Sequence, residues 1–382
     1  MEALVSTIHA VAGNASSGLH EPVFAGNEKA YLNDCIDTGF VSSAGEYVTL
    51  FEQELSKFTG APHAIAVVNG STALHLALVA IGVKPGDEVI VPALSFVATA
   101  NAVAHAGATP HFVDVGEETW GLDPVALQNY LATVGHNVGG RLMNSETGRP
   151  ITAIVPMHTL GHPANMQGIK GVAEEYGLLI VEDAAESLGS MIGDTHTGLF
   201  GRVGIFSFNG NKTITTGGGG ALVTSDPELA SHIRHLSTTA RIPHRFEFDH
   251  DEIGYNYRMP NVNAALGVAQ MEQLPVFLAS QLELFERYQN AFADWTEVEV
   301  KMGVKGTKSN YWLQALYLSE GLDFDRDKVI TNALSQGLPV RPMWKPLNLI
   351  GAHATSPSAP TPVAHEVYER VVCLPSSTSL VD

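Results

Sequence analysis

Lys212 lies in a polar turn, SFNGNKTITTGGGG, between two apolar runs at residues 204–209 and 220–224. Most lysines are solvated surface charges, and that interpretation remains open for this one. A lysine amine held in a partly desolvated site can instead attack a carbonyl group and form a Schiff base. The four glycines at 217–220 carry no side chains and would let another backbone approach closely. The segment therefore predicts either a surface turn or a nucleophilic lysine.

Asp183 closes an apolar run in the segment VEDAAESLGS. A carboxylate at that position either caps a helix or pairs with a cationic group. One such group is the protonated ring nitrogen of pyridoxal phosphate (PLP), which must stay protonated if the ring is to accept electrons. Both interpretations are open on this segment alone.

A third segment, NGSTALHLAL at 69–78, contains Gly70, Ser71 and Thr72 between a strand-like run and a helical one. The free amides and the positive dipole end of a helix that starts there would suit a phosphate group. Serine and threonine are also common helix caps, so simple capping explains the same residues.

Two further segments are less specific. The segment GYNYRMPNVNAALG contains Asn256 and Arg258, and its alternation of aromatic and polar residues suits a subunit interface, a ligand rim or ordinary loop packing. In PMHTLGHP, His158 and His162 stand four apart, but Gly161 and Pro163 make a metal-binding helix unfavourable. Neither Cys35 nor Cys373 has a partner at metal-ligand spacing, so we expect no metal site.

Short apolar runs alternate with helical stretches from about residue 20 to residue 225. This pattern predicts a mostly parallel sheet with helices on both faces. Ligands bind such sheets beyond the carboxyl ends of the strands, where the polar segments fall. The predicted strands are at 64–68, 88–93, 111–115, 151–158, 178–185, 204–209 and 220–224.

The later part of the chain is more helical and leads to a second unit. We predict an N-terminal extension at 1–19, a large domain at 20–255, and a smaller α+β domain at 256–382 that includes the linking helix. Strands at 310–318 and 338–344 would belong to this small domain.

Composition excludes several classes of partner. The chain has 382 residues and a formal charge of −19, which opposes binding to nucleic acid or an anionic membrane. No apolar run reaches the roughly 18 residues of a membrane span. The start has Glu2 and no early basic residue, unlike a signal peptide. With only two cysteines, we expect a cytoplasmic location.

Together these segments resemble the DegT/DnrJ/EryC1/StrS family of sugar aminotransferases, from HEPVF at 20–24 to LPSS at 374–377. The resemblance depends on the order of NGSTAL, PALSFVATANA, VEDAAESLGS, SFNGNK with its glycine run, and GYNYRMP. It implies a three-layer, fold-type I large domain with PLP as cofactor. Within the family, SFNGNK and HTLGHPANM are most similar to the LegC-type branch.

The resemblance also implies roles for individual residues. Lys212 would bind the cofactor covalently and move protons, and Asp183 would pair with the ring nitrogen. Glu186 would lie near the ring hydroxyl, where family members usually have Gln or His. The cofactor-binding set would be Gly70, Ser71, Thr72, Phe96, Asp183, Glu186, Ser207, Lys212 and Asn256, and the substrate set His158 and Arg258.

Asn256 would reach the phosphate in a neighbouring subunit, which implies a homodimer with shared active sites. The implied reaction moves the amino group of L-glutamate to UDP-4-keto-6-deoxy-N-acetylglucosamine. A GDP-perosamine synthase acting on GDP-4-keto-6-deoxymannose and a PLP-binding protein without turnover are the alternatives. Relatives that dehydrate sugars have His at the position of Lys212, so transamination is favoured. A nucleotide-dependent oxidoreductase would need a G-x-G-x-x-G turn, which NGST does not supply.

Overall fold

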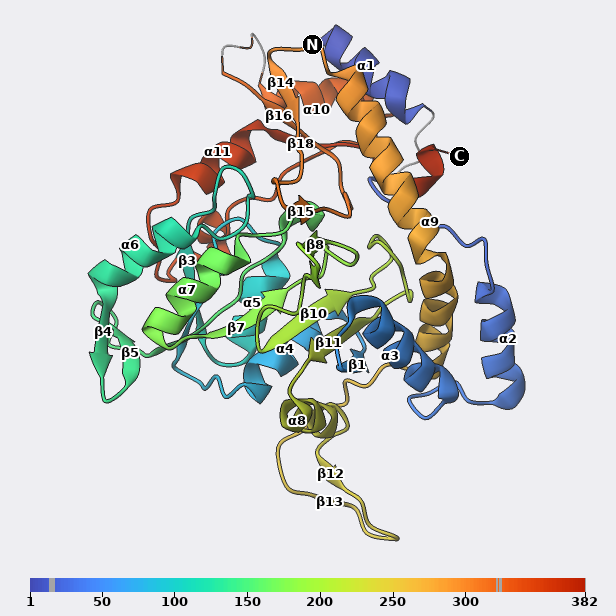
Figure 1. The fold of residues 1–382 in the computed structure, drawn as a ribbon, viewed down its shortest axis with the longest axis vertical. Helices are drawn as coiled ribbons and strands as arrows, with labels where there is room; N and C mark the ends of the chain where they lie inside the picture. Colours follow the sequence, from blue (N-terminus) through green and yellow to red (C-terminus); the bar gives the residue numbers. More distant parts are fainter. Residues whose placement is uncertain (14–17, 321, 323–324, 382) are drawn as a thin grey trace.

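The central feature of the protein is a mostly parallel sheet. The structure is a computed structural model and describes residues 1–13, 18–320, 322 and 325–381. Within these residues, seven strands pair in the order β1-β11-β10-β7-β6-β2-β3 (Figure 1). Only β11 runs antiparallel to its neighbours in this sheet. The strands are β1 (His63–Val67), β2 (Glu88–Pro92), β3 (Thr109–Val113), β6 (Ile151–Ile154), β7 (Leu179–Asp183), β10 (Val203–Ser207) and β11 (Gly220–Thr224). All seven predicted strands are therefore present.

Helices cover both faces of this sheet, as the apolar runs predicted. Alternate residues of one strand point to opposite faces. Ile65 and Val67 of β1 belong to one apolar cluster, and Ala64 and Ala66 belong to another. The first face carries α4 (Gly70–Ala80), α5 (Val97–His105) and α8 (Pro227–Ser237). The second carries α3 (Glu46–Thr59), α6 (Pro124–Val134), α7 (Met166–Tyr176) and the first part of α9 (Asn261–Ala291).

The long helix α9 links this layered unit to a smaller one (Figure 1). Val268 and Leu274, in its first part, pack against the second face of the large sheet. Leu284 and Tyr288, further along the helix, pack in the core of the second unit. That unit has a four-stranded sheet in the order β14-β16-β18-β17. Its elements are β14 (Val298–Val300), β16 (Ala315–Leu318), α10 (Arg326–Ser335), β17 (Arg341–Pro342), α11 (Pro362–Arg370) and β18 (Val371–Cys373).

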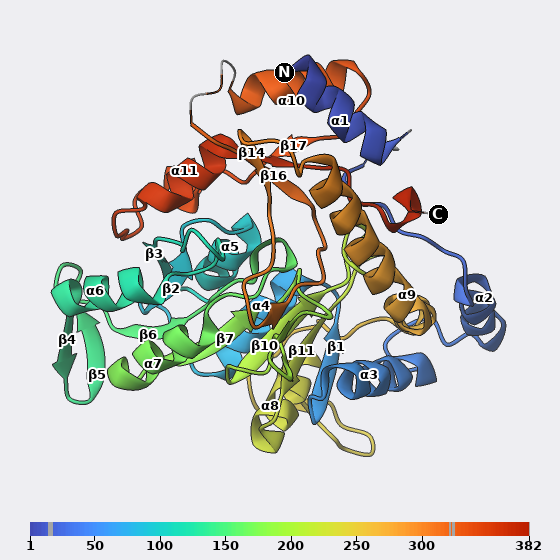
Figure 2. The same ribbon diagram turned by 45° about the horizontal axis from the view of Figure 1, so that its top comes forward.

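The N-terminal helix α1 (Glu2–Ala12) packs on the small unit (Figure 2). Its buried Leu4, Val5 and Ile8 join the core around Leu284 and Val298. The first residues are thus part of a folded core, although the boundaries at 19/20 and 255/256 stay predictions.

One further helix and several short strands lie outside the two main sheets. The helix α2 (Glu28–Thr38) lies beside α9. Short strands form three further pairings: β4 (Gly135–Val138) with β5 (Arg141–Asn144), β8 (Met191–Ile192) with β9 (Thr195–His196) and β15 (Thr307–Lys308), and β12 (Arg241–Ile242) with β13 (Asp249–His250). Among the described residues, no helix has the combination of length and apolar character that crossing a membrane requires.

Side-chain caps fix where several helices begin. The Asp123 carboxylate caps α6 by accepting hydrogen bonds from the amides of Val125 and Ala126 at 3.0 and 3.3 Å. The Asn69 side chain caps α4 in the same manner, by accepting from the amide of Thr72 at 2.8 Å. Such caps satisfy amides that have no partner inside the helix.

Candidate active site

A cavity of about 520 Å³ lies between the carboxyl ends of the central strands and the small unit. This is the edge of the sheet at which ligands bind in open α/β folds. The lining comes from segments far apart in the sequence: Leu19, Asn69, Gly70, Ser71, Leu74, Phe96, Ala98, Met157, Leu160, Asp183, Ala185, Glu186, Ser207, Asn209, Asn211, Lys212, Trp312, Leu313, Arg341, Pro342, Trp344 and Cys373.

Lys212 is held inside this cavity and is not a solvated surface charge. Its side chain is 12% exposed, and its Nζ donates to Glu186 Oε1 at 3.0 Å. The same Nζ lies 4.0 Å from the centre of the Trp312 ring, a cation–π contact. The Trp312 ring is itself fixed, because its Nε1 donates to the carbonyl of Asn211 at 2.7 Å. The amine therefore has one defined position beside a carboxylate and an aromatic face.

Glu186 is the buried partner of this lysine, and its side chain is 1% exposed. Its second oxygen, Oε2, accepts from the amide of Leu160 at 2.9 Å. Leu160 adopts a left-handed backbone with φ of 55°, an uncommon conformation for this residue type. Burial raises the pKa of Glu186 to about 7, while the positive charge of Lys212 acts in the opposite direction. The carboxyl group can thus gain or lose a proton near neutral pH.

Asp183 stands at the end of β7 in the same cavity. Its Oδ2 accepts from Thr99 Oγ1 at 2.8 Å, and its Oδ1 accepts from the amide of Ala185 at 3.2 Å. Burial raises the pKa of Asp183, because a low-dielectric surrounding disfavours the charge. A cation placed beside this carboxylate would restore its ionised form.

The start of α4 and the end of β10 meet at another wall of the cavity. A Cβ atom on Gly70 would lie 2.8 Å from Ser207 Cβ, so only glycine allows this approach. A Cβ atom on Gly220 would lie 2.5 Å from the carbonyl carbon of Asn69, so this glycine also permits close packing. The first amides of α4, at Gly70 and Ser71, have no partner within the helix. Together with the Ser71 and Ser207 hydroxyls they form a cradle suited to an anion.

Phe96 lies at the open side of the cavity. Its side chain is 49% exposed, and its ring centre is 6.2 Å from that of Trp344, at an angle of 64°. Arg341, from the small unit, is exposed at the same side.

Four of the predicted site residues lie outside this lining. Thr72 is on the first turn of α4, where its hydroxyl donates to the Asn69 carbonyl at 2.8 Å. His158 is fully buried, with Nε2 3.1 Å from Glu182 Oε2 and Nδ1 accepting from the amide of Ala164 at 3.0 Å. Asn256 is exposed, and Arg258 pairs with Val67 beside the sheet.

Several residues that complete the site have no role in the motifs described above. Trp312 lies a hundred residues from Lys212 along the chain, so no local motif links the two. Thr99 belongs to a predicted motif, yet its bond to Asp183 needs the fold. His20 is buried. This burial, together with the smaller effect of the positive charge on Lys212, lowers the pKa of His20 to about 4.

The chemistry of these groups matches PLP. An anion cradle at Gly70, Ser71 and Ser207 suits its phosphate, the Asp183 carboxylate suits a protonated ring nitrogen, and the Lys212 amine suits its aldehyde. Because Gly70 has no side chain, the backbone at the start of α4 lies close to Ser207, and both can contact the same phosphate group. Fold and site together define an aminotransferase of fold type I.

Comparisons with known proteins identify the family. The model of the DegT/DnrJ/EryC1/StrS aminotransferase family matches residues 23–382, and the chain belongs to this family. It is therefore a PLP-dependent sugar aminotransferase.

The chain is similar to named relatives and to solved structures over most of the length of each protein. GDP-perosamine synthase of Caulobacter vibrioides is 38% identical, over 87% of this chain and 85% of the relative. The protein of the same name from Escherichia coli O157:H7 is 34% identical, over 95% and 93%. The crystal structure of a DegT DnrJ EryC1 StrS aminotransferase from Brucella abortus is 30% identical, has a TM-score of 0.82, and covers 92% of this chain and 90% of its own.

Proposed function

We propose that the protein transfers the amino group of L-glutamate to the C4 carbonyl of a nucleotide-linked 4-keto-6-deoxy sugar, in the synthesis of a surface polysaccharide or glycan. The product is the corresponding 4-amino sugar. The observation that carries this proposal is the position of Lys212, whose amine stands 3.0 Å from Glu186 in a cavity that also exposes the Asp183 carboxylate.

Each residue has a task in this proposal. PLP, when bound, supplies an electron-accepting ring that lets an amino group leave one carbon and join another. Lys212 holds the cofactor at rest and moves a proton when its amine is free. Asp183 keeps the ring nitrogen charged. Glu186, with its pKa raised to about 7, orients the lysine amine and can exchange a proton with it at neutral pH.

The open side of the cavity is the proposed entrance for donor and acceptor. Arg341 supplies a positive charge there for the carboxylate of the donor or for a diphosphate. Phe96 and Trp344 supply aromatic surface for the cofactor ring and the sugar. His158 and Arg258 stay predictions as substrate residues, and the contacts of His158 favour a supporting role behind the cavity.

Two nucleotides compete in this proposal. The motifs SFNGNK and HTLGHPANM favour UDP-4-keto-6-deoxy-N-acetylglucosamine. The two GDP-perosamine synthases, at 38% and 34% identity, favour GDP-4-keto-6-deoxymannose. Both substrates present the same reacting carbonyl, and Lys212 and Asp183 would treat them alike.

We also propose that the active unit is a homodimer. Asn256 is exposed and lies outside the cavity of its own chain, so it is free to reach the cofactor phosphate of a partner. Light scattering after gel filtration tests this, and a monomeric mass in the active preparation would contradict it.

The experiment for the reaction is a paired substrate assay. The PLP-loaded protein is incubated with L-glutamate and either the UDP sugar or the GDP sugar, and the amino sugar is identified by mass spectrometry and NMR. Amination of either sugar at C4 supports the proposed reaction, and the faster substrate identifies the nucleotide. Exchange of glutamate without amination of a 4-keto sugar would reject the proposed acceptor. Absence of both reactions would favour a PLP-binding protein without turnover.

A further inference from the structure

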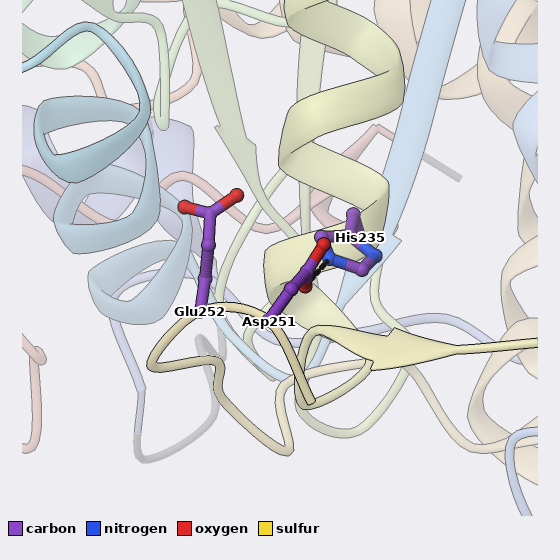
Figure 3. Close-up of side chains that lie close together, drawn as sticks. All are labelled: His235, Asp251 and Glu252. Atoms are coloured by element: carbon purple, nitrogen blue, oxygen red, sulfur yellow. Dashed lines mark hydrogen bonds and ion pairs between the residues drawn. The ribbon is translucent and has the colours of Figure 1, made fainter. Parts of the chain in front are cut away.

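A group of metal-binding side chains lies on the opposite side of the protein from the small unit. The helix α8 ends beside the segment that follows the hairpin β12–β13 (Figure 1). In this place His235, Asp251 and Glu252 each offer a ligand atom, and the three atoms lie within 4.8 Å of one another (Figure 3). Asp251 and Glu252 were not singled out from the sequence, because 15 residues separate them from the histidine.

The distances between these atoms suit a small ion after modest adjustment. His235 Nε2 is 2.6 Å from Asp251 Oδ1. His232, one turn earlier on the same face of α8, has Nε2 3.1 Å from Glu252 Oε2. A metal with bonds of about 2.0–2.2 Å would replace the hydrogen atom shared by His235 and Asp251 and move these two side chains apart by less than about 1 Å. One imidazole and two carboxylates give three ligands, and a water molecule can take the fourth position of a tetrahedral site.

The local charges favour a divalent cation. Asp251 and Glu252 are adjacent carboxylates on a chain with a formal charge of −19. Their ion-pair partners among the described residues are the two histidines, which are uncharged when their rings are deprotonated. Arg234, between those histidines in sequence, faces Glu52 instead, at 2.8 Å. The carboxylates are thus left with imidazole partners, and imidazole binds zinc in its neutral form.

We propose that His235, Asp251 and Glu252 form a zinc-type site that fastens the hairpin to α8. The mixture of nitrogen and oxygen ligands selects zinc over magnesium or calcium, which prefer oxygen ligands alone. This site is separate from the catalytic cavity and differs from our expectation, based on sequence, of no metal site.

The position of the site gives the ion a structural effect. His235 precedes the hairpin and Asp251 follows it, so one ion would join both ends of the loop and reduce its freedom. The segment after the hairpin runs beside β1, where Val68 donates to the carbonyl of Tyr257 at 2.9 Å. Next along the chain from Val68 are Asn69 and Gly70, at the anion cradle. The ion would therefore stiffen the region that carries Asn256 and Arg258.

Zinc binding to untagged, PLP-loaded protein tests the proposal. After treatment with a chelator and dialysis, ZnCl₂ is titrated by calorimetry, with MgCl₂ in parallel. We expect one zinc ion per chain and much weaker binding of magnesium. His235→Ala and Asp251→Asn should each weaken zinc binding about tenfold or more. The control is His244→Ala, in the same hairpin, which should bind zinc like the wild type.

A second readout follows the hairpin itself. Arg245 is exposed at the tip, so trypsin can cleave there. Zinc should slow this cleavage in the wild type and in His244→Ala, but not in His235→Ala. Equal zinc binding by wild type and His235→Ala, or equal binding of zinc and magnesium, would overturn the proposal. Failure of zinc to bind at one ion per chain would do the same.

Discussion

Glu186 allows a quantitative test of the site, because it is a buried acid beside the lysine. Burial raises its pKa from 4.5 to about 7 in the folded protein. The folded state therefore binds the Glu186 proton more tightly than the unfolded state. The stabilisation from this proton is complete below about pH 4.5 and is lost as the pH rises through about 7.

The perturbation is Glu186→Gln, which keeps the shape of the side chain and removes its titration. With these pKa values, proton linkage through Glu186 lowers the unfolding free energy of the wild type by about 2.5 kcal/mol as the pH rises from 5 to 8. In the variant this decrease in unfolding free energy is absent, because glutamine does not titrate. The difference in stability, variant minus wild type, should thus move by about 2.5 kcal/mol in favour of the variant over this range.

The assay is urea unfolding of the cofactor-free proteins, followed by tryptophan fluorescence at several pH values. Asp183 is also buried and is present in both proteins. Glu146→Gln, at an exposed position, is the matched control and should keep the wild-type pH profile. A difference between Glu186→Gln and wild type that stays constant from pH 5 to pH 8 would refute the reasoning.

Three further predictions concern the cofactor. Gly70→Ala should weaken PLP affinity about tenfold in a fluorescence titration, since its Cβ would lie 2.8 Å from Ser207 Cβ; Gly171→Ala, with open space at its Cβ, should leave affinity unchanged. Asp183→Asn should still bind PLP but lose about hundredfold or more in kcat, measured with L-glutamate, because the ring nitrogen loses its charged partner. Asn256→Ala should weaken PLP affinity about tenfold without changing the dimer mass, as expected for one lost hydrogen bond to the phosphate. Unchanged PLP affinity in Gly70→Ala or Asn256→Ala, or full turnover in Asp183→Asn, would contradict the corresponding assignment.

The sequence was informative where local patterns decide structure. The short apolar runs of the central sheet are typical of strands buried on both faces, so β1 and β7 were predictable. Asp123 was recognisable as a cap because a proline and a helical run follow it. The motifs around Asp183 and Lys212 could be placed at one edge of the sheet, because parallel strands present their carboxyl ends together.

Contacts between distant segments were beyond such patterns. Nothing in NYWLQ indicates that Trp312 packs against Lys212, since the small unit must first fold back over the sheet. His158 was a predicted substrate residue, but its ring is buried against Glu182. The grouping of His235 with Asp251 likewise depends on how the hairpin returns to α8. In each case tertiary packing, and not local spacing, decides which side chains meet.

The central claim is that Lys212 carries PLP and that the loaded protein accepts an amino group from glutamate. An absorbance spectrum of the purified protein, recorded before and after addition of L-glutamate, tests it directly. We predict that the wild type shows the long-wavelength band of lysine-linked PLP, that glutamate removes this band with formation of pyridoxamine phosphate, and that Lys212→Ala lacks the band. A lysine-linked band in Lys212→Ala, or a wild-type band that glutamate leaves unchanged, would contradict the account.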